Sequence, residues 1–67
     1  MRNTLKRIRE VKGYTLREMG ELIGFNYSYY SRVEKGERDG SYIFWEKIRS
    51  FYGIEKSSVW RLMIEES

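Results

Sequence analysis

Residues 15–34 read TLREMGELIGFNYSYYSRVE, and the signals in this stretch decide how the chain folds. Thr15 and Glu18 fit a capping box, in which the Thr15 hydroxyl accepts from the Glu18 backbone N–H and the Glu18 carboxylate accepts from the Thr15 N–H. The apolar residues that follow recur at the spacing of one helical face, at Leu16, Met19 and Ile23. Together the cap and the spacing predict a helix that begins directly after Thr15.

A sharp bend and a second helix are expected next. Gly24 can adopt the left-handed backbone that ends a helix without a Cβ clash. Asn26 is a favoured N-cap, so a helix is predicted over 27–35, with Tyr30 and Val33 on its inward side. Two short helices joined by a tight turn, with hydrogen-bonding side chains opening the second, form a helix-turn-helix over 15–34.

An ordered pattern surrounds this motif. It is close to L-x-x-I-R-x-x-x-G-x-T-x-x-E-L-A-x-x-L-G followed by S-x-[IVW]-E-x-G. The residues that carry the match are Leu5, Ile8, Arg9, Gly13, Thr15, Glu18, Met19, Gly20, Ile23, Gly24, Ser31, Val33, Glu34, Gly36, Ile48, Gly53 and Ile54. On these residues the run 5–52 resembles the Cro/repressor type of helix-turn-helix proteins, often called the XRE family. The resemblance implies an all-α, lambda-repressor-like fold, a compact bundle of four to five short helices.

Several positions depart from the family pattern, among them Arg49, where the family usually has Ala. Leu16 stands where the family commonly has a Gln that bonds a phosphate, which leaves the backbone N–H groups at that helix start as donors. Gly20 replaces Ala, at about 1 kcal/mol of helix stability, and a small residue there lets the two helices cross closely. Gly40 stands where the family often has Pro, so a more flexible loop is expected.

The remaining helices are predicted over 4–12, 42–52 and about 57–65. In the first, the residues expected to face inward are Leu5, Ile8 and Val11, and those expected to face water are Arg2, Lys6, Arg7 and Lys12. The helix over 42–52 should bury Phe44, Trp45, Ile48, Phe51 and Tyr52. Such rings can also stack on bases, but core packing explains this spacing better.

The predicted last helix, 57–65, is more apolar than one buried side requires. Its apolar residues are Val59, Trp60, Leu62, Met63 and Ile64. Two explanations stay open, a contact between two copies of the chain or a helix that wraps a small core.

Composition limits the function. Sixty-seven residues allow one domain, 1–67, and the chain contains neither Cys nor His. Thiolate metal sites and His-dependent catalytic sets are therefore ruled out, and no phosphate-binding Gly motif occurs. We expect no cofactor, no metal and no enzymatic activity. No apolar run approaches the ~20 residues of a membrane span, and no secretory signal is recognisable, so a cytoplasmic protein is expected.

The positive charge is unevenly distributed. Residues 1–38 hold nine Lys/Arg against five Asp/Glu, a net charge of +4, whereas residues 39–67 hold four against five, a net charge of −1. A basic half that coincides with the helix-turn-helix fits a polyanionic partner. The alternative is that these side chains are ordinary solvated surface.

The resemblance implies a transcriptional regulator that binds double-stranded DNA in a sequence-specific way. The helix over 27–35 would enter the major groove, as part of a dimer on a palindromic operator. Arg9 and Glu34 occupy family positions that imply a partly buried ion pair between the first helix and this one. Arg suits such a pair because its planar fork can bond a carboxylate twice.

The exposed face of the helix over 27–35 supplies candidate contacts. Tyr27 and Ser28 lie in the first turn, which enters the groove most deeply, and Arg32 falls on the same face one turn later. These three are expected to read bases, with Ser31 assisting. Phosphate contacts are expected from Asn26, Arg17, Lys35, Arg38 and Tyr29. The alternatives are that the tyrosines only pack and that the cations of the loop are only solvated.

A second function belongs to another class of protein. A domain of this fold can act as a protein-binding modulator of another regulator, in the manner of an antirepressor. The aromatic residues between Phe25 and Tyr30 would suit such an interface, where Tyr is favoured. DNA titrations at two salt concentrations distinguish the two functions.

Overall fold

The computed structural model describes residues 1–64, and this part of the chain contains helices and no strand. The helices are α1 (Asn3–Lys12), α2 (Leu16–Ile23), α3 (Tyr27–Lys35), α4 (Tyr42–Tyr52) and α5 (Lys56–Ile64). The all-α prediction with four to five short helices is confirmed. The first and last helices each begin one residue earlier than expected, and the end expected at Glu65 lies outside the described residues.

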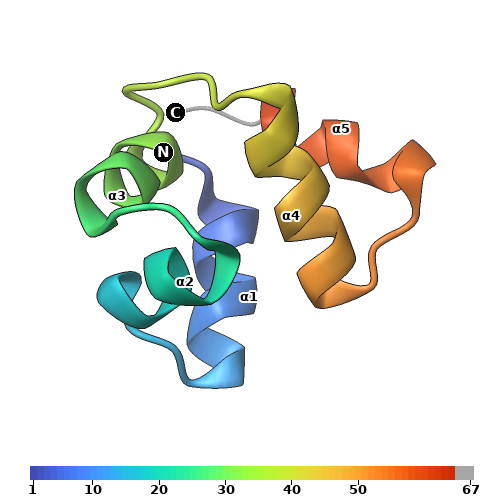
Figure 1. The fold of residues 1–67 in the computed structure, drawn as a ribbon. Helices are drawn as coiled ribbons and strands as arrows, with labels where there is room; N and C mark the ends of the chain where they lie inside the picture. Colours follow the sequence, from blue (N-terminus) through green and yellow to red (C-terminus); the bar gives the residue numbers. More distant parts are fainter. Residues whose placement is uncertain (65–67) are drawn as a thin grey trace.

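The helices pack as a small bundle in which α2 is central. It packs on α3 and on α4, while α1 packs on α3 and α4 packs on α5. In Figure 1, α1, α2 and α3 lie together on one side, and α4 lies between this group and α5. The end of α5 lies beside the start of the chain, since Arg2 donates to the Met63 carbonyl.

Local signals in the sequence set the starts of the helices. The Thr15 hydroxyl accepts from the Glu18 N–H at 3.1 Å and the Glu18 carboxylate accepts from the Thr15 N–H at 2.8 Å, so the capping box is complete. The Asn26 side chain accepts from the Tyr29 N–H at 2.8 Å and begins α3. Ser41 caps α4 in the same way, accepting from Phe44 at 3.1 Å. Each cap satisfies a backbone donor that has no partner within its helix.

Gly20 and Gly40 are required by close approaches. A Cβ on Gly20 would lie 2.9 Å from the Phe25 carbonyl oxygen, so the small residue accommodates the turn of the motif. Gly40 has φ +85°, and a Cβ there would lie 2.6 Å from Nε1 of Trp45, which donates to the Asp39 carbonyl at 2.9 Å. Gly40 therefore holds a left-handed conformation against a buried ring, and the expectation of a more flexible loop stays a prediction.

All five helices contribute to one apolar core. Its buried residues are Leu5, Met19, Ile23, Tyr30, Val33, Phe44, Trp45, Ile48, Val59 and Leu62. Of the other residues expected to face inward, Ile8, Leu16 and Tyr52 are partly buried and pack against this core, whereas Val11 and Phe51 are exposed. Val11 is 79% exposed, because two positions after the buried Arg9 the helical period turns a side chain to the opposite side of α1, and Phe51 is 37% exposed at the edge of α4.

Arg2 was expected to face water, and it is buried instead, with 2% of its surface exposed. Its guanidinium donates to the carbonyls of Val33 and Arg38, and twice to that of Met63, at 3.2 and 3.0 Å. The guanidinium also lies 5.4 Å from the centre of the Trp45 ring. Carbonyls in the last turn of a helix lack intrahelical donors, and Arg offers five, so this side chain joins the ends of α3 and α5.

An ion pair joins α1 to the end of α3, as the sequence resemblance implied. Nε and Nη2 of Arg9 donate to the two Glu34 oxygens at 2.9 and 3.0 Å, in the bidentate geometry. The Tyr30 hydroxyl donates to Oε2 of Glu34 at 2.9 Å, and Nη1 of Arg9 donates to the Tyr14 carbonyl at 2.8 Å. The bond to Glu34 raises the pKa of Arg9, and burial raises the pKa of Tyr30.

Candidate nucleic-acid interface

The exposed face of α3 begins directly after its cap. Tyr27 is 44% exposed, and Ser28 and Arg32 are exposed as well, whereas Tyr30 and Val33 point into the core. Ser28 and Arg32 share a face because they lie one turn apart. The residues one turn after Tyr27, Tyr30 and Ser31, are buried, and Tyr27 is exposed at the first position of α3. Tyr27, Ser28 and Arg32 are therefore available together to a partner that lies along α3.

A shallow hollow lies beside this face. Its volume is about 200 Å³ and it is lined by Asn26, Ser28, Tyr29, Arg32 and Arg38. We call it the α3 hollow. Two arginines and no carboxylate line it, so its lining is positively charged. The structure thus brings together, from α3 and the following loop, five of the side chains expected to contact DNA.

Arg17 reaches the same region from α2. Its Cζ atom lies 5.1 Å from the centre of the Tyr27 ring, a distance at which a guanidinium is attracted to an aromatic face. Each residue lies in the first turn of its helix, so the starts of α2 and α3 meet on one side of the molecule. Arg17 is exposed and belongs to this surface.

Tyr29 serves packing and the surface at once. Its ring stacks on Phe25, with centroids 5.3 Å apart, and meets Phe44 edge to face at 5.6 Å. Its hydroxyl accepts from the Ser41 N–H at 3.0 Å, which fixes the start of α4 relative to α3. The hydroxyl hydrogen remains a donor in the α3 hollow, so one residue combines both roles.

Ser31 and Lys35 lie outside the α3 hollow for different reasons. Ser31 is 5% exposed on the inward side of α3, so the expectation that it assists base reading does not fit its position. Lys35 is exposed at the last position of α3, one helix length from the first turn. Leu16 packs against the core, so its side chain offers nothing to a phosphate.

Arg2 is the residue with a structural role in this interface that sequence reasoning missed. It binds the Val33 and Arg38 carbonyls, and so holds the end of α3 and the loop that carries Arg38. Its other partner, Met63, is 61 positions away in the sequence. A local pattern cannot report a contact over that separation. Nothing in the basic start of the chain distinguished Arg2 from the neighbouring exposed cations.

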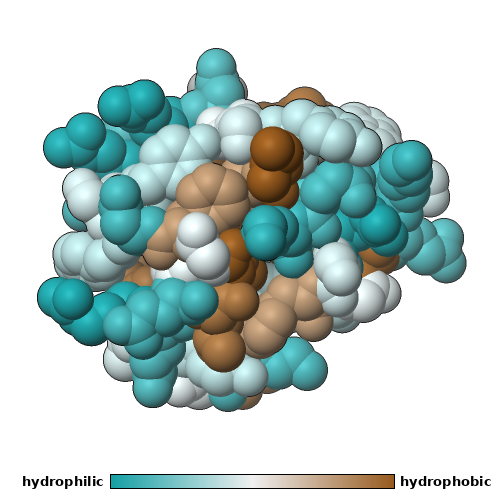
Figure 2. Space-filling model, viewed as in Figure 1, coloured by the Kyte–Doolittle hydropathy of each residue, from teal (hydrophilic) through white to brown (hydrophobic). Residues whose placement is uncertain are grey.

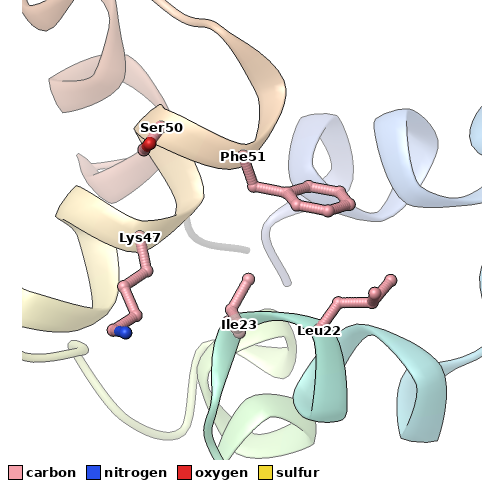
Figure 3. A pocket seen from close by; sticks show the side chains of 5 residues that line it. All are labelled: Leu22, Ile23, Lys47, Ser50 and Phe51. Carbon is pink, nitrogen blue, oxygen red and sulfur yellow. The ribbon is translucent and has the colours of Figure 1, made fainter.

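A second hollow lies between α2 and α4. It measures about 230 Å³ and is lined by Leu22, Ile23, Lys47, Ser50 and Phe51. Figure 3 shows Leu22 and Ile23 on α2 facing the Phe51 ring on α4, with Lys47 at one side. In Figure 2, apolar surface forms a band down the middle of the molecule, flanked by hydrophilic side chains on both sides. The hollow between α2 and α4 contains none of the residues expected to contact DNA.

Within 1–64, no cluster of three or more acidic, His or Cys side chains could hold a metal ion. In the same residues, none of the helices combines the length and the apolar character needed to cross a membrane.

The geometry defines an all-α protein with a helix-turn-helix motif, and comparison with known proteins agrees. A family model described as a helix-turn-helix domain matches residues 1–62, so the chain belongs to this family. The match is consistent with the Cro/repressor-type resemblance, and it indicates DNA binding and a role in transcription regulation. The family is typically non-enzymatic. No curated protein and no solved structure gives a significant match to the chain.

Proposed function

We propose that the protein is a regulator that binds a specific sequence in double-stranded DNA, with α3 in the major groove. The observation that carries this proposal is the α3 hollow, where Ser28 and Arg32 of the reading face meet Arg38 and Tyr29. A helix that presents polar side chains from its first turn, beside cations that can bind phosphates, suits a groove flanked by two phosphate backbones. Residues 1–67 would act as one domain, in the cytoplasm.

Base reading falls to the exposed face of α3. Arg32 can donate twice to O6 and N7 of guanine, and such a pair discriminates by about 1–3 kcal/mol against other bases. Ser28 can bond to several bases, and Tyr27 can contact a thymine methyl group or a phosphate. The exposure of Ser28 and Arg32 on one face, with Tyr27 exposed at the start of α3, supports this division of roles.

Phosphate binding falls to the residues around that face. Arg38 lies in the α3 hollow, Lys35 ends α3, and Arg17 opens α2. Asn26 caps α3 with its side-chain oxygen, so its amide N–H groups point outward as donors, and the Tyr29 hydroxyl adds another. These contacts would fix the position of the protein without reading the sequence.

The protein would bind as a dimer on a palindrome, with α5 as the contact between copies. One α3 reads only a few base pairs, so a second copy about 34 Å away, one turn of the duplex, extends the site. Val59 and Leu62 bury one side of α5 in the core, whereas Trp60, at 49% exposed, and Ile64, at 62%, stay on its surface. Wrapping the core therefore accounts for only part of the apolar content of α5.

The protein-binding alternative rested on the aromatic residues from Phe25 to Tyr30. In the structure Tyr30 is in the core, and Phe25 and Tyr29 pack against it, which leaves Tyr27 as the exposed ring of this set. The surface proposed for that function is therefore small. Another exposed apolar surface, formed by Leu22 and Phe51, lies in the hollow between α2 and α4.

The experiment is a selection of duplexes from a random pool, followed by titration of single-position operator variants. Arg32→Ala should relax the preference at one guanine position in each half-site, whereas Lys35→Ala should weaken all sequences about equally. Lys47→Ala is the matched control, because it removes a cation from the other hollow. If Arg32→Ala lowered binding to selected and random duplexes by the same factor, Arg32 would be a phosphate contact and this assignment would be wrong.

A further inference from the structure

Arg17 and Tyr27 form a contact between the two helices of the motif. The guanidinium of Arg17 lies over the face of the Tyr27 ring, with Cζ 5.1 Å from the ring centre. Both side chains are exposed, and each stands in the first turn of its helix. Within residues 1–64 Arg17 forms no ion pair, so the ring is the partner that orients it.

We propose that these two side chains act as one recognition unit, in which Arg17 orients Tyr27 so that the ring reads the C5-methyl group of a thymine. The inference rests on the proposed DNA-binding function and adds the chemistry of one base contact. Arg17 covers one face of the ring, and Tyr27 is still 44% exposed, so part of its surface is available to the partner. Among the groups that base pairs present in the major groove, the thymine methyl is the apolar one, and it suits an aromatic face.

Arg17 is therefore a positioning residue as well as a candidate phosphate contact. A planar guanidinium that stacks on a ring keeps its N–H groups free at its edge, where they can donate to a phosphate. An exposed tyrosine with no such neighbour would move between rotamers, and binding would have to order it. Loss of Arg17 should then have two effects that can be separated: weaker binding to every duplex and weaker discrimination for the methyl group.

The test replaces each thymine of the selected operator, one at a time, by deoxyuridine, which removes only the methyl group. For the full chain, we expect one position per half-site where this replacement weakens binding about fourfold, the effect of burying one methyl group. In Tyr27→Ala this thymine-to-uracil ratio should fall to about one, and in Tyr27→Phe it should persist, because the ring remains. In Arg17→Ala it should fall below about twofold.

Lys35→Ala is the matched control for the loss of a cation, since it removes a candidate phosphate contact at the other end of α3. It should weaken both duplexes and leave the ratio near fourfold. The inference is overturned if Arg17→Ala weakens binding to the thymine and uracil duplexes by the same factor. It is also overturned if the thymine-to-uracil ratio of affinities is unchanged in Tyr27→Ala. A protein that selects no sequence at all would instead overturn the proposed function. Because both residues are exposed, unchanged melting temperatures would show that the variants fold.

Discussion

Replacing Glu34 by Gln should remove most of the stability of this protein. The Glu34 carboxylate accepts two hydrogen bonds from Arg9, at 2.9 and 3.0 Å, and one from Tyr30 at 2.9 Å, and its side chain is 3% exposed. The amide of Gln has one oxygen, so its NH2 group must face a donor of Arg9 or Tyr30. Arg9 would be left buried without a compensating charge, which costs about 3–5 kcal/mol.

The size of the protein makes this loss large. At the usual 0.05–0.15 kcal/mol per residue, a chain of this length has a free energy of unfolding of roughly 3–10 kcal/mol. Urea unfolding followed by circular dichroism and by the fluorescence of buried Trp45 would measure the change. Glu34→Gln should shift the midpoint strongly toward low urea, or unfold the protein in buffer alone.

Glu46→Gln is the matched control. It breaks the ion pair of Glu46 with Arg49, at 3.1 Å, whose side chains are 30% and 32% exposed. Exposed pairs of this kind contribute about 0.3–0.5 kcal/mol. The combined variant Arg9→Met with Glu34→Leu should recover much of the stability, because neither charge of this pair is then left buried without its partner. A Glu34→Gln protein within about 1 kcal/mol of the original, or no less stable than Glu46→Gln, would refute the reasoning.

Three further predictions concern stability. Arg2→Met removes the Arg2 donors from the Arg38 and Met63 carbonyls and leaves the Val33 carbonyl with the Gly36 N–H alone, and should cost at least ~2 kcal/mol in urea unfolding, with faster amide exchange in α5. Gly40→Ala should lower the melting temperature, since φ is +85° and the Cβ would meet Trp45; a temperature equal to that of Gly13→Ala, where a Cβ meets nothing, would count against the close approach. Burial raises the pKa of Tyr30, so the unfolded chain loses this proton first, and stability present below pH ~10 should fall above it by up to about 1.4 kcal/mol per pH unit. Burial also raises the pKa of Tyr52 to about 12, which acts in the same direction, and urea midpoints that stay constant from pH 8 to about 11 would contradict both.

The elements of the fold could be predicted because their signals are local. The Thr15 capping box, the Asn26 cap and the glycine at the bend each act within a few residues, and the structure contains all three. The ion pair between Arg9 and Glu34 spans 25 positions, and it was expected through the family pattern rather than through local spacing.

The wrong predictions concern the contacts and orientations of side chains, which a local sequence pattern does not report. Arg2 is buried because its partners come from α3, the following loop and α5, none of which a local pattern near residue 2 reports. Val11 has the apolar character of a core residue, yet it lies on the opposite side of α1 from the buried Leu5 and Arg9 and is exposed. Ser31 has a hydroxyl that could bond a base, but α3 packs on the core with Ser31 on its buried side.

The meeting of Arg17 with Tyr27 could not be predicted for a similar reason. The helical period placed each residue on an exposed face, but the angle between α2 and α3 decides whether those faces meet. That angle depends on the close approach of Gly20 to the turn, where a Cβ would lie 2.9 Å from the Phe25 carbonyl oxygen.

The central claim is that α3 and its surrounding cations bind a specific DNA sequence, and an anisotropy titration tests it most directly. The protein would be titrated into a selected duplex and a shuffled duplex at about 50 and 200 mM salt. Three phosphate contacts per copy, from Arg17, Lys35 and Arg38, give a dimer a salt slope of roughly −5 and a loss of about 10³-fold over this range. The selected duplex should bind at least ~10³-fold more tightly than the shuffled one. Equal affinity for both duplexes, or affinity that does not change with salt, would contradict the account.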